Sequence, residues 1–235
     1  MSFRSLISLV VAIVATCSAT NLSTVEAAVG FKSPNSWTRG ASGTTYQHWS
    51  FFDDYPTDSL PDLGNINPNG TASITETTGG GLVTGSGNIY TPGAAANFVV
   101  TIPEQDVPAP PHDITALVQI RTLGTLLDLS SVTLNTLAPK MYFELFSAPS
   151  PMGGANVEHW FLFNVPYTSF GDGVGPDVED LTLNFTSTDI HMSLDEISID
   201  TAIRPFGFYP EAVPEPSTAL LALASLAGVG VLRRN

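Results

Sequence analysis

The sequence predicts an all-β fold, an antiparallel β-sandwich of about eight or nine strands arranged like a jelly roll. Two observations predict it: apolar and polar residues alternate along many short stretches, and turn-forming residues separate these stretches. The composition agrees, because 20 glycines and 18 prolines suit short strands joined by turns. Charged residues make up only 13%, about half the usual share. No comparable stretch shows the period of a helix.

From the N-terminus, strands are predicted over residues 44–52, 71–77, 98–102, 114–120, 140–146, 158–165, 181–185 and 193–201. The alternation is clearest in 98–102, 114–120 and 181–185, which we therefore expect to be half-buried, with one face in the core and one in solvent. Glycine, proline, asparagine and aspartate gather between the strands, at residues 67–70, 79–81, 108–111, 149–151 and 171–173. In the last strand the apolar phase shifts between Leu194 and Ile197, which predicts a β-bulge at Asp195-Glu196.

Residues 1–27 are predicted to be a signal peptide. Arg4 precedes an apolar run from Leu6 to Ala15, which has the length of a signal-peptide core and is too short to span a bilayer. Small residues allow cleavage by signal peptidase after Ala19 or after Ala27. The only cysteine, Cys17, lies in this segment, so the domain that follows has no thiol for disulfides or zinc. Lipidation of Cys17 is a minor alternative, because the residues before it match a lipobox loosely.

The C-terminal residues 213–235 are predicted to be a sorting tail. Pro214-Glu215-Pro216 is followed by an uncharged apolar segment, residues 217–232, and then by Arg233 and Arg234. The segment is at the short end of the range for a transmembrane helix, and the two arginines would keep its end in the cytoplasm. The prolines beside Glu215 favour an extended, protease-accessible chain. A permanent C-terminal anchor is the alternative.

This tail resembles the PEP-CTERM sorting signal almost position for position. The resemblance implies a membrane-embedded exosortase as partner, transient membrane anchoring, cleavage near the motif, and delivery to the cell surface or an extracellular matrix. Residues 28–212 then form the exported domain. Its final stretch, Leu194-Asp195-Glu196-Ile197-Ser198-Ile199-Asp200, resembles the last strand of jelly-roll, carbohydrate-binding-like domains in such proteins, a shorter and less specific likeness.

The charge and the motifs narrow the range of functions. The net charge is −14, so a nucleic-acid partner is not expected, because no basic patch exists to neutralise phosphates. The motifs of zinc proteases, serine hydrolases and phosphate-binding loops are absent. None of the four histidines, His48, His112, His159 and His191, has metal spacing to another, and His48 and His159 are interpreted as ordinary strand residues. No catalytic residue is assigned, and we expect that the protein is not an enzyme, although a carboxylate pair could arise from the fold.

No cofactor is assigned, and a structural calcium ion is the one candidate. Asp172, Asp177, Glu179 and Asp180 crowd one loop, and such loops offer the oxygen ligands that Ca²⁺ prefers. A second acidic loop contains Asp53, Asp54, Asp58 and Asp62. Neither loop has the EF-hand spacing, and the more ordinary interpretation is that both are solvated.

The function expected from these observations is a noncatalytic structural or interaction role at the cell surface or in the matrix. The alternative is a carbohydrate-binding module that takes an extracellular polysaccharide; a secreted hydrolase comes third. Sugar binding would use exposed rings, and the available rings are those of Trp37, Tyr46, Trp49, Tyr142 and Trp160. An aromatic shelf on one sheet would favour the binding module, and a surface covered with threonine would favour the structural role.

Overall fold

A computed structural model describes residues 30–103, 112–150, 153–166 and 180–205. The described strands all belong to one compact unit that begins at Phe31. The predicted signal peptide (1–27) and the sorting tail (213–235, with its apolar segment 217–232) lie outside the described residues. Within the described residues, no helix is long and apolar enough to cross a membrane.

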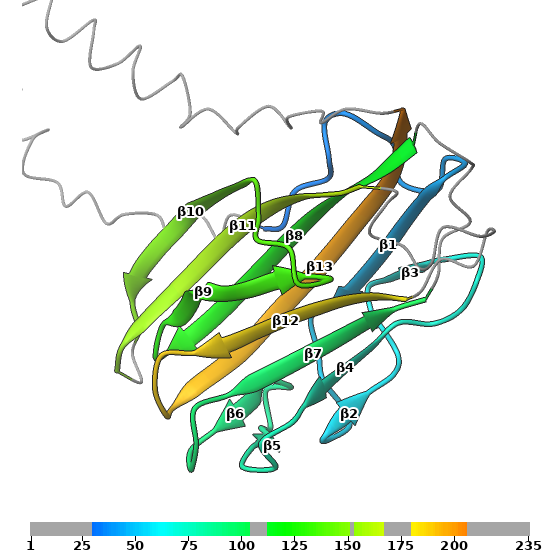
Figure 1. Cartoon of the computed structure of the whole chain (residues 1–235). Helices are drawn as coiled ribbons and strands as arrows, with labels where there is room; N and C mark the ends of the chain where they lie inside the picture. The colour runs from blue at the N-terminus through cyan, green and yellow to red at the C-terminus, as the bar shows by residue number, and fades with distance from the viewer. Residues whose placement is uncertain (1–29, 104–111, 151–152, 167–179, 206–235) are drawn as a thin grey trace, which may run out of the picture. The chain divides into compact units, whose positions relative to one another are not determined.

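The described chain forms two antiparallel sheets that pack face to face (Figure 1). We call them sheet A and sheet B. Sheet A has eight strands, with the order β10-β11-β8-β13-β1-β3 and with β6 and β5 added beside β13. Its strands are β1 (Thr44–Trp49), β3 (Gly64–Ile66), β5 (Leu82–Val83), β6 (Ile89–Thr91), β8 (His112–Gly124), β10 (Met141–Pro149), β11 (Ala155–Val165) and β13 (Met192–Pro205).

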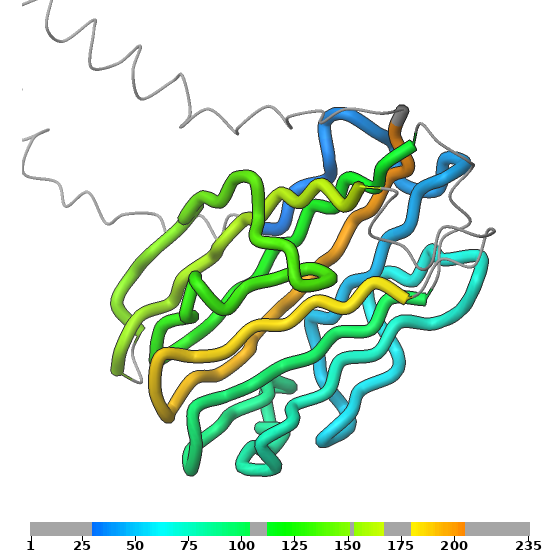
Figure 2. The backbone as a smooth tube through the Cα atoms, viewed as in Figure 1, coloured from blue at the N-terminus to red at the C-terminus, as the bar shows by residue number. Residues whose placement is uncertain are grey.

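Sheet B has five strands in the order β2-β4-β7-β12-β9. They are β2 (Thr57–Asp58), β4 (Ser73–Glu76), β7 (Asn97–Ile102), β9 (Leu127–Leu134) and β12 (Leu181–Ser187). The chain crosses between the sheets at most connections, as the tube in Figure 2 shows. Late strands therefore lie between early ones: β13 separates β1 from β8, and β12 separates β7 from β9.

The all-β sandwich and the predicted strands are confirmed. Each predicted strand overlaps an observed one, and the β-bulge is present, because the pairing of β13 with β8 shifts register between Leu194 and Glu196. The prediction missed β2, β3, β5, β6 and β9. Four of these have only two or three residues, which is too short to show a period of two.

The core lies between the two sheets and consists of the inward-facing residues of both. In sheet B, Phe98 of β7 stacks on its cross-strand partner Phe185 of β12, with ring centroids 5.0 Å apart. Trp49 and Phe52, at and after the end of β1, are fully buried. Residues 98–102 and 181–185 alternate between buried and half-buried as predicted.

Half-burial was the wrong prediction for residues 114–120. Every residue from Asp113 to Ile120 of β8 is buried, the polar Thr115 and Gln119 included. The physical reason is a second apolar layer on the outer side of sheet A. Leu117, Trp160 and Leu162 form a small cluster there, and Trp37 packs against it. Trp37 belongs to residues 31–39, which we call the covering segment.

Candidate functional site: a pocket at one end of sheet A

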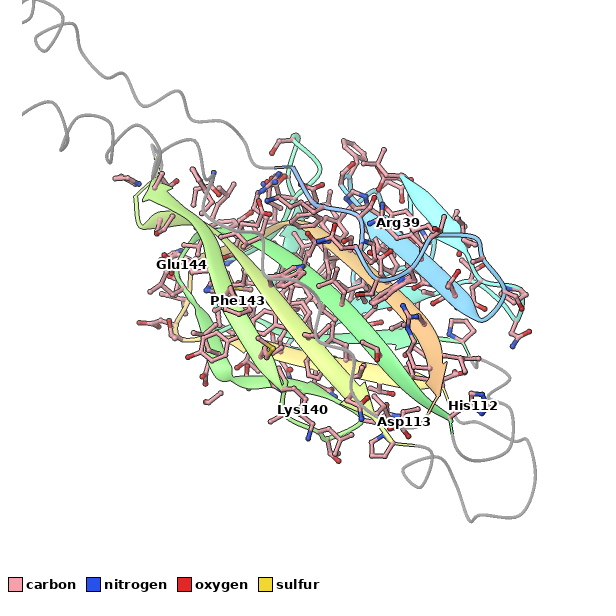
Figure 3. All side chains as sticks on the ribbon, turned by 90° about the horizontal axis from the view of Figure 1, so that it is seen from above. Arg39, His112, Asp113, Lys140, Phe143 and Glu144 are labelled. Atoms are coloured by element: carbon pink, nitrogen blue, oxygen red, sulfur yellow. The ribbon has the colours of Figure 1, made fainter. Side chains whose placement is uncertain are left out.

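The covering segment is fastened to the outer face of sheet A by specific polar contacts. The Lys32 amide donates to Gln119 Oε1 at 2.8 Å, and Gln119 Nε2 donates back to the Lys32 carbonyl at 2.9 Å. Arg39 pairs with the fully buried Asp200 through two nitrogens, at 2.6 and 2.8 Å, the geometry that holds a carboxylate most firmly. Figure 3 shows Arg39 on this segment, above the sheet. The segment is therefore an integral part of the fold.

A chain of charged groups follows the covering segment along the same face. His48 Nδ1 hydrogen-bonds the Tyr46 hydroxyl at 2.7 Å, and His48 Nε2 lies 2.7 Å from Glu196 Oε1. Arg121 contacts Glu196 and also donates to Glu158 Oε2 at 3.1 Å. His48 was interpreted from the sequence as an ordinary strand residue, but it takes part in this network. Burial raises the pKa of the Glu158 carboxyl, although the guanidinium of Arg121 opposes this.

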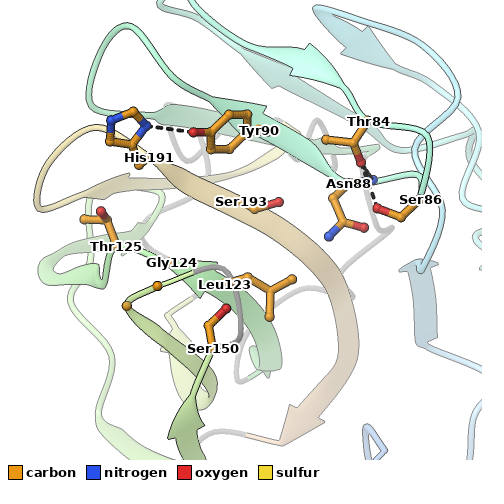
Figure 4. Close-up of a pocket in the computed structure, with 12 residues that line it drawn as sticks. Thr84, Ser86, Asn88, Tyr90, Leu123, Gly124, Thr125, Ser150, His191 and Ser193 are labelled. Atoms are coloured by element: carbon orange, nitrogen blue, oxygen red, sulfur yellow. Dashed lines mark hydrogen bonds between the residues drawn. The ribbon is translucent and has the colours of Figure 1, made fainter.

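Beyond Arg121, the same face opens into a pocket of about 690 Å³, which we call the end pocket. Strand pairing places Tyr90 of β6, Ser193 of β13 and Leu123 of β8 side by side. Figure 4 shows Ser193 between the other two side chains. The lining consists of Thr84, Ser86, Asn88, Tyr90, Leu123, Gly124, Thr125, Ser150, Gly153, Gly154, His191 and Ser193.

The walls of the end pocket are turns packed closely against one another. A side chain at Gly154 would collide with the backbone of Gly124, and one at Gly124 would collide with the carbonyl of His191. His191 itself has a positive φ of 69°, a conformation that is uncommon for a residue with a Cβ. Hydrogen bonds hold it there: its amide donates to the Thr91 carbonyl at 2.8 Å, and its carbonyl accepts from Thr125 at 3.2 Å. Strained backbone of this kind often marks a functional site.

The pocket offers rings, hydroxyls and amides. The rings of Tyr90 and His191 are nearly parallel, 19° apart, and the Tyr90 hydroxyl bonds His191 Nδ1 at 2.7 Å. Thr84 and Ser86 share a hydrogen bond of 2.9 Å across the turn between β5 and β6. None of the lining residues is an aspartate, glutamate, lysine or arginine. The described lining thus supplies rings, hydroxyls and amides, the kinds of group that orient a small ligand.

The structure bears only in part on the calcium prediction. Asp172, Asp177 and Glu179 lie outside the described residues, while Asp180 is exposed just before β12. In the other acidic loop, Asp58 and Asp62 accept hydrogen bonds from backbone amides, such as Asp62 from Ser50 at 2.7 Å. The part of the chain that is described contains no cluster of acidic, histidine or cysteine side chains able to hold a metal ion.

The aromatic residues proposed for sugar binding do not form an exposed shelf. Trp49 and Trp160 are buried, Tyr46 is buried beneath Arg39, and Trp37 packs onto sheet A. Only Tyr142 is largely exposed, at 54%. The sequence reasoning missed the lining of the end pocket, and the signal that could have found it is the set of glycines at 124, 153 and 154.

Comparison with protein families identifies the C-terminal tail. Residues 212–235 match the PEP-CTERM protein-sorting motif, which includes Pro214, Glu215, Pro216, Arg233 and Arg234, all outside the described residues. No curated protein and no solved structure matches the chain. The chain is therefore an exported protein that an exosortase sorts to the cell surface, and its described part is an all-β sandwich.

Proposed function

We propose that this protein has a noncatalytic structural or interaction role at the cell surface or in the extracellular matrix. In this proposal, signal peptidase removes residues 1–27, the apolar segment 217–232 holds the protein transiently in the membrane, and an exosortase then acts near Pro214-Glu215-Pro216. The exported domain, residues 28–212, is a jelly-roll-like sandwich, which the nested strand orders β1-β13-β8 and β7-β12-β9 support.

The observation that carries the noncatalytic role is how the described carboxylates are used. Glu76 accepts hydrogen bonds from Thr78, Gly79 and Asn97 at the turn after β4. Asp200, Glu158 and Glu196 are paired with arginines. These are structural uses, and none of the described residues that line the end pocket is acidic. A calcium ion held by the loop with Asp172, Asp177, Glu179 and Asp180 stays a prediction.

The outer face of sheet B supports the same proposal. Its strand pairing aligns short polar side chains across neighbouring strands, and these positions are half-buried or exposed. They are Thr57, Ser73, Thr75, Asn97, Thr101, Thr133, Thr182, Asn184 and Thr186, together with Val99. This is the threonine-covered surface that the structural role predicts.

Replacement of Pro214, Glu215 and Pro216 by alanine tests the sorting step. In a host that contains an exosortase, we expect the variant to stay full-length in the inner membrane, because the apolar segment remains while the recognition motif is gone. Cell fractionation and immunoblotting measure this. Release of the triple variant at the normal rate would contradict exosortase processing at this motif. Reducing-end release from polysaccharides, if observed, would contradict the noncatalytic role.

A further inference from the structure

We propose that the end pocket binds a neutral sugar segment of an extracellular polysaccharide. This inference rests on the proposed noncatalytic function and gives it a ligand of stated chemistry. It places recognition at the turns that meet at one end of sheet A, rather than on an aromatic sheet face.

The hydrogen-bonding groups of the pocket match a polyhydroxylated ligand. A serine or threonine hydroxyl both donates and accepts, as each hydroxyl of a sugar does. Such groups reach the pocket from separate elements: Ser86 from the turn between β5 and β6, Ser193 from β13, and Ser150 from the turn between β10 and β11. Figure 4 shows these side chains around a common space. A ligand in that space can be contacted from several sides.

The stacked rings of Tyr90 and His191 supply an apolar surface for the C–H face of a sugar. Tyr90 is half-buried, with its hydroxyl bonded to His191 Nδ1, so its ring orientation is fixed before any ligand arrives. The left-handed backbone of His191 is held in turn by Thr91 and Thr125. Binding to groups that are already ordered avoids the entropy cost of ordering them. The volume of about 690 Å³ lies within the range for small-ligand pockets, about 300–1,000 Å³.

The electrostatics favour a neutral polymer over an anionic one. The described lining contains no lysine or arginine, and Arg121, an arginine on the same face, is already engaged by Glu158, Asp195 and Glu196. Burial raises the pKa of the Asp195 carboxyl, and Asn88 of the pocket lies close enough to act in the opposite direction, so that carboxylate is near the site. The net charge of −14 adds long-range repulsion for uronate or sulfate groups. Neutral glucans and mannans meet none of these penalties.

Affinity electrophoresis of the full chain tests the proposal. The protein is kept in a detergent without a sugar head group and run through gels that contain dextran, amylose, laminarin, galactomannan, alginate or polygalacturonate. We expect retardation by at least one of the four neutral polymers and none by the two anionic ones. Replacement Ser193→Leu, which fills the space between Tyr90 and Leu123, should weaken that retardation about tenfold or more.

Two further variants make the result decisive. Ser86 lies on an exposed turn of the pocket, so Ser86→Leu should weaken binding without disturbing the fold even if Ser193→Leu does not fold. Thr182→Leu, on the outer face of sheet B, is the matched control and should bind like the original chain. The proposal is overturned if no neutral polymer retards the protein, if Ser86→Leu and Thr182→Leu bind equally, or if the anionic polymers bind better. Reducing-end release with intact retention would instead contradict only the noncatalytic role.

Discussion

The outer faces of the two sheets differ in how they meet solvent: that of sheet A is covered by other parts of the chain, and that of sheet B is open. On sheet A, the covering segment and the apolar cluster around Trp160 bury residues that would otherwise face solvent, and buried charges are then paired by Arg39 and Arg121. On sheet B, threonine, serine and asparagine face outward and need no cover. The difference shows that the ion pairs of Arg39 and Arg121, in a domain with few charges, lie on the covered face of sheet A, where they are shielded from water. Mutations on sheet A should therefore have large effects, and similar ones on sheet B small effects.

The largest effect is expected from Arg121→Ala. This change leaves Glu158, which is 1% exposed, and Glu196 without their shared cation. Breaking a buried ion pair from one side costs about 3–5 kcal/mol, and we expect about 3 kcal/mol here because the Arg121 side chain keeps 16% exposure. Thermal or urea unfolding measures the loss. Lys140→Ala, at an exposed cation, is the control, and an equal loss in both variants would contradict the comparison.

Trp37→Ala should have the next largest effect. Trp37 packs from the covering segment onto Leu117, Trp160 and Leu162, and its partial exposure lowers the cost below that of a fully buried tryptophan, to about 2 kcal/mol. The neighbouring exposed Thr38→Ala should cost little. Limited proteolysis adds a second measurement, since a loosened covering segment would be cut faster in Trp37→Ala. Equal cleavage rates would mean that the polar contacts of Lys32 and Arg39 hold the segment alone.

The same comparison explains which parts of the structure the sequence could predict. Residues 98–102 and 181–185 alternate cleanly because one side of each strand meets the core and the other meets solvent. Residues 114–120 alternate equally well, but Gln119 is covered by Lys32, 87 positions away, and Leu117 clusters with Trp160, Leu162 and Trp37, which are also far away in the chain. No local pattern reports such a contact.

The polar lining of the end pocket was missed for the same physical reason, although the glycines at 124, 153 and 154 do mark its tight turns. Tyr90, Leu123, Ser150 and Ser193 are far apart in the chain and meet only through strand pairing and close turn packing. Each of them is an ordinary residue in its local sequence. The C-terminal sorting motif, in contrast, is contiguous, and the prediction from the sequence is confirmed by the match to residues 212–235.

Acid should stabilise the face of sheet A, and Glu158→Gln should remove part of this effect. Burial raises the pKa of Glu158 and of Asp195 in the folded protein, against the opposing charge of Arg121. A carboxyl whose pKa is higher in the folded state takes up its proton first in that state as the pH falls. Stability therefore rises as the pH falls through the raised pKa and gains nothing further below the unfolded value.

Thermal melts between pH 7.5 and 5 measure this dependence. Lys32, Arg121 and Glu196 act on Glu158, while His48 pairs with Glu196 and Asp195 with Arg121. These groups, and the relief of the protein's general negative charge at lower pH, are common to the original chain and to Glu158→Gln. We expect the melting temperature to rise less steeply in Glu158→Gln than in the original chain. Glu144→Gln, at an exposed position of β10, should keep the original slope. If the melting temperature changed with pH at the same rate in the original chain and in both variants, the protein's general charge alone would set the pH dependence of its stability.

The smallest effects come from one substitution made on both faces. Thr115, on the covered face of sheet A, is fully buried, and its hydroxyl has no hydrogen-bond partner among the described residues. Thr115→Val removes this unsatisfied group without changing the shape of the side chain, and we expect a gain of about 1 kcal/mol. Thr101→Val, between Ser73 and Thr182 on the open face of sheet B, should change stability by less than about 0.5 kcal/mol. Urea unfolding distinguishes the two. A lower free energy of unfolding in Thr115→Val would show that bound water satisfies its hydroxyl. The threonine hydroxyls of both faces would then be hydrated.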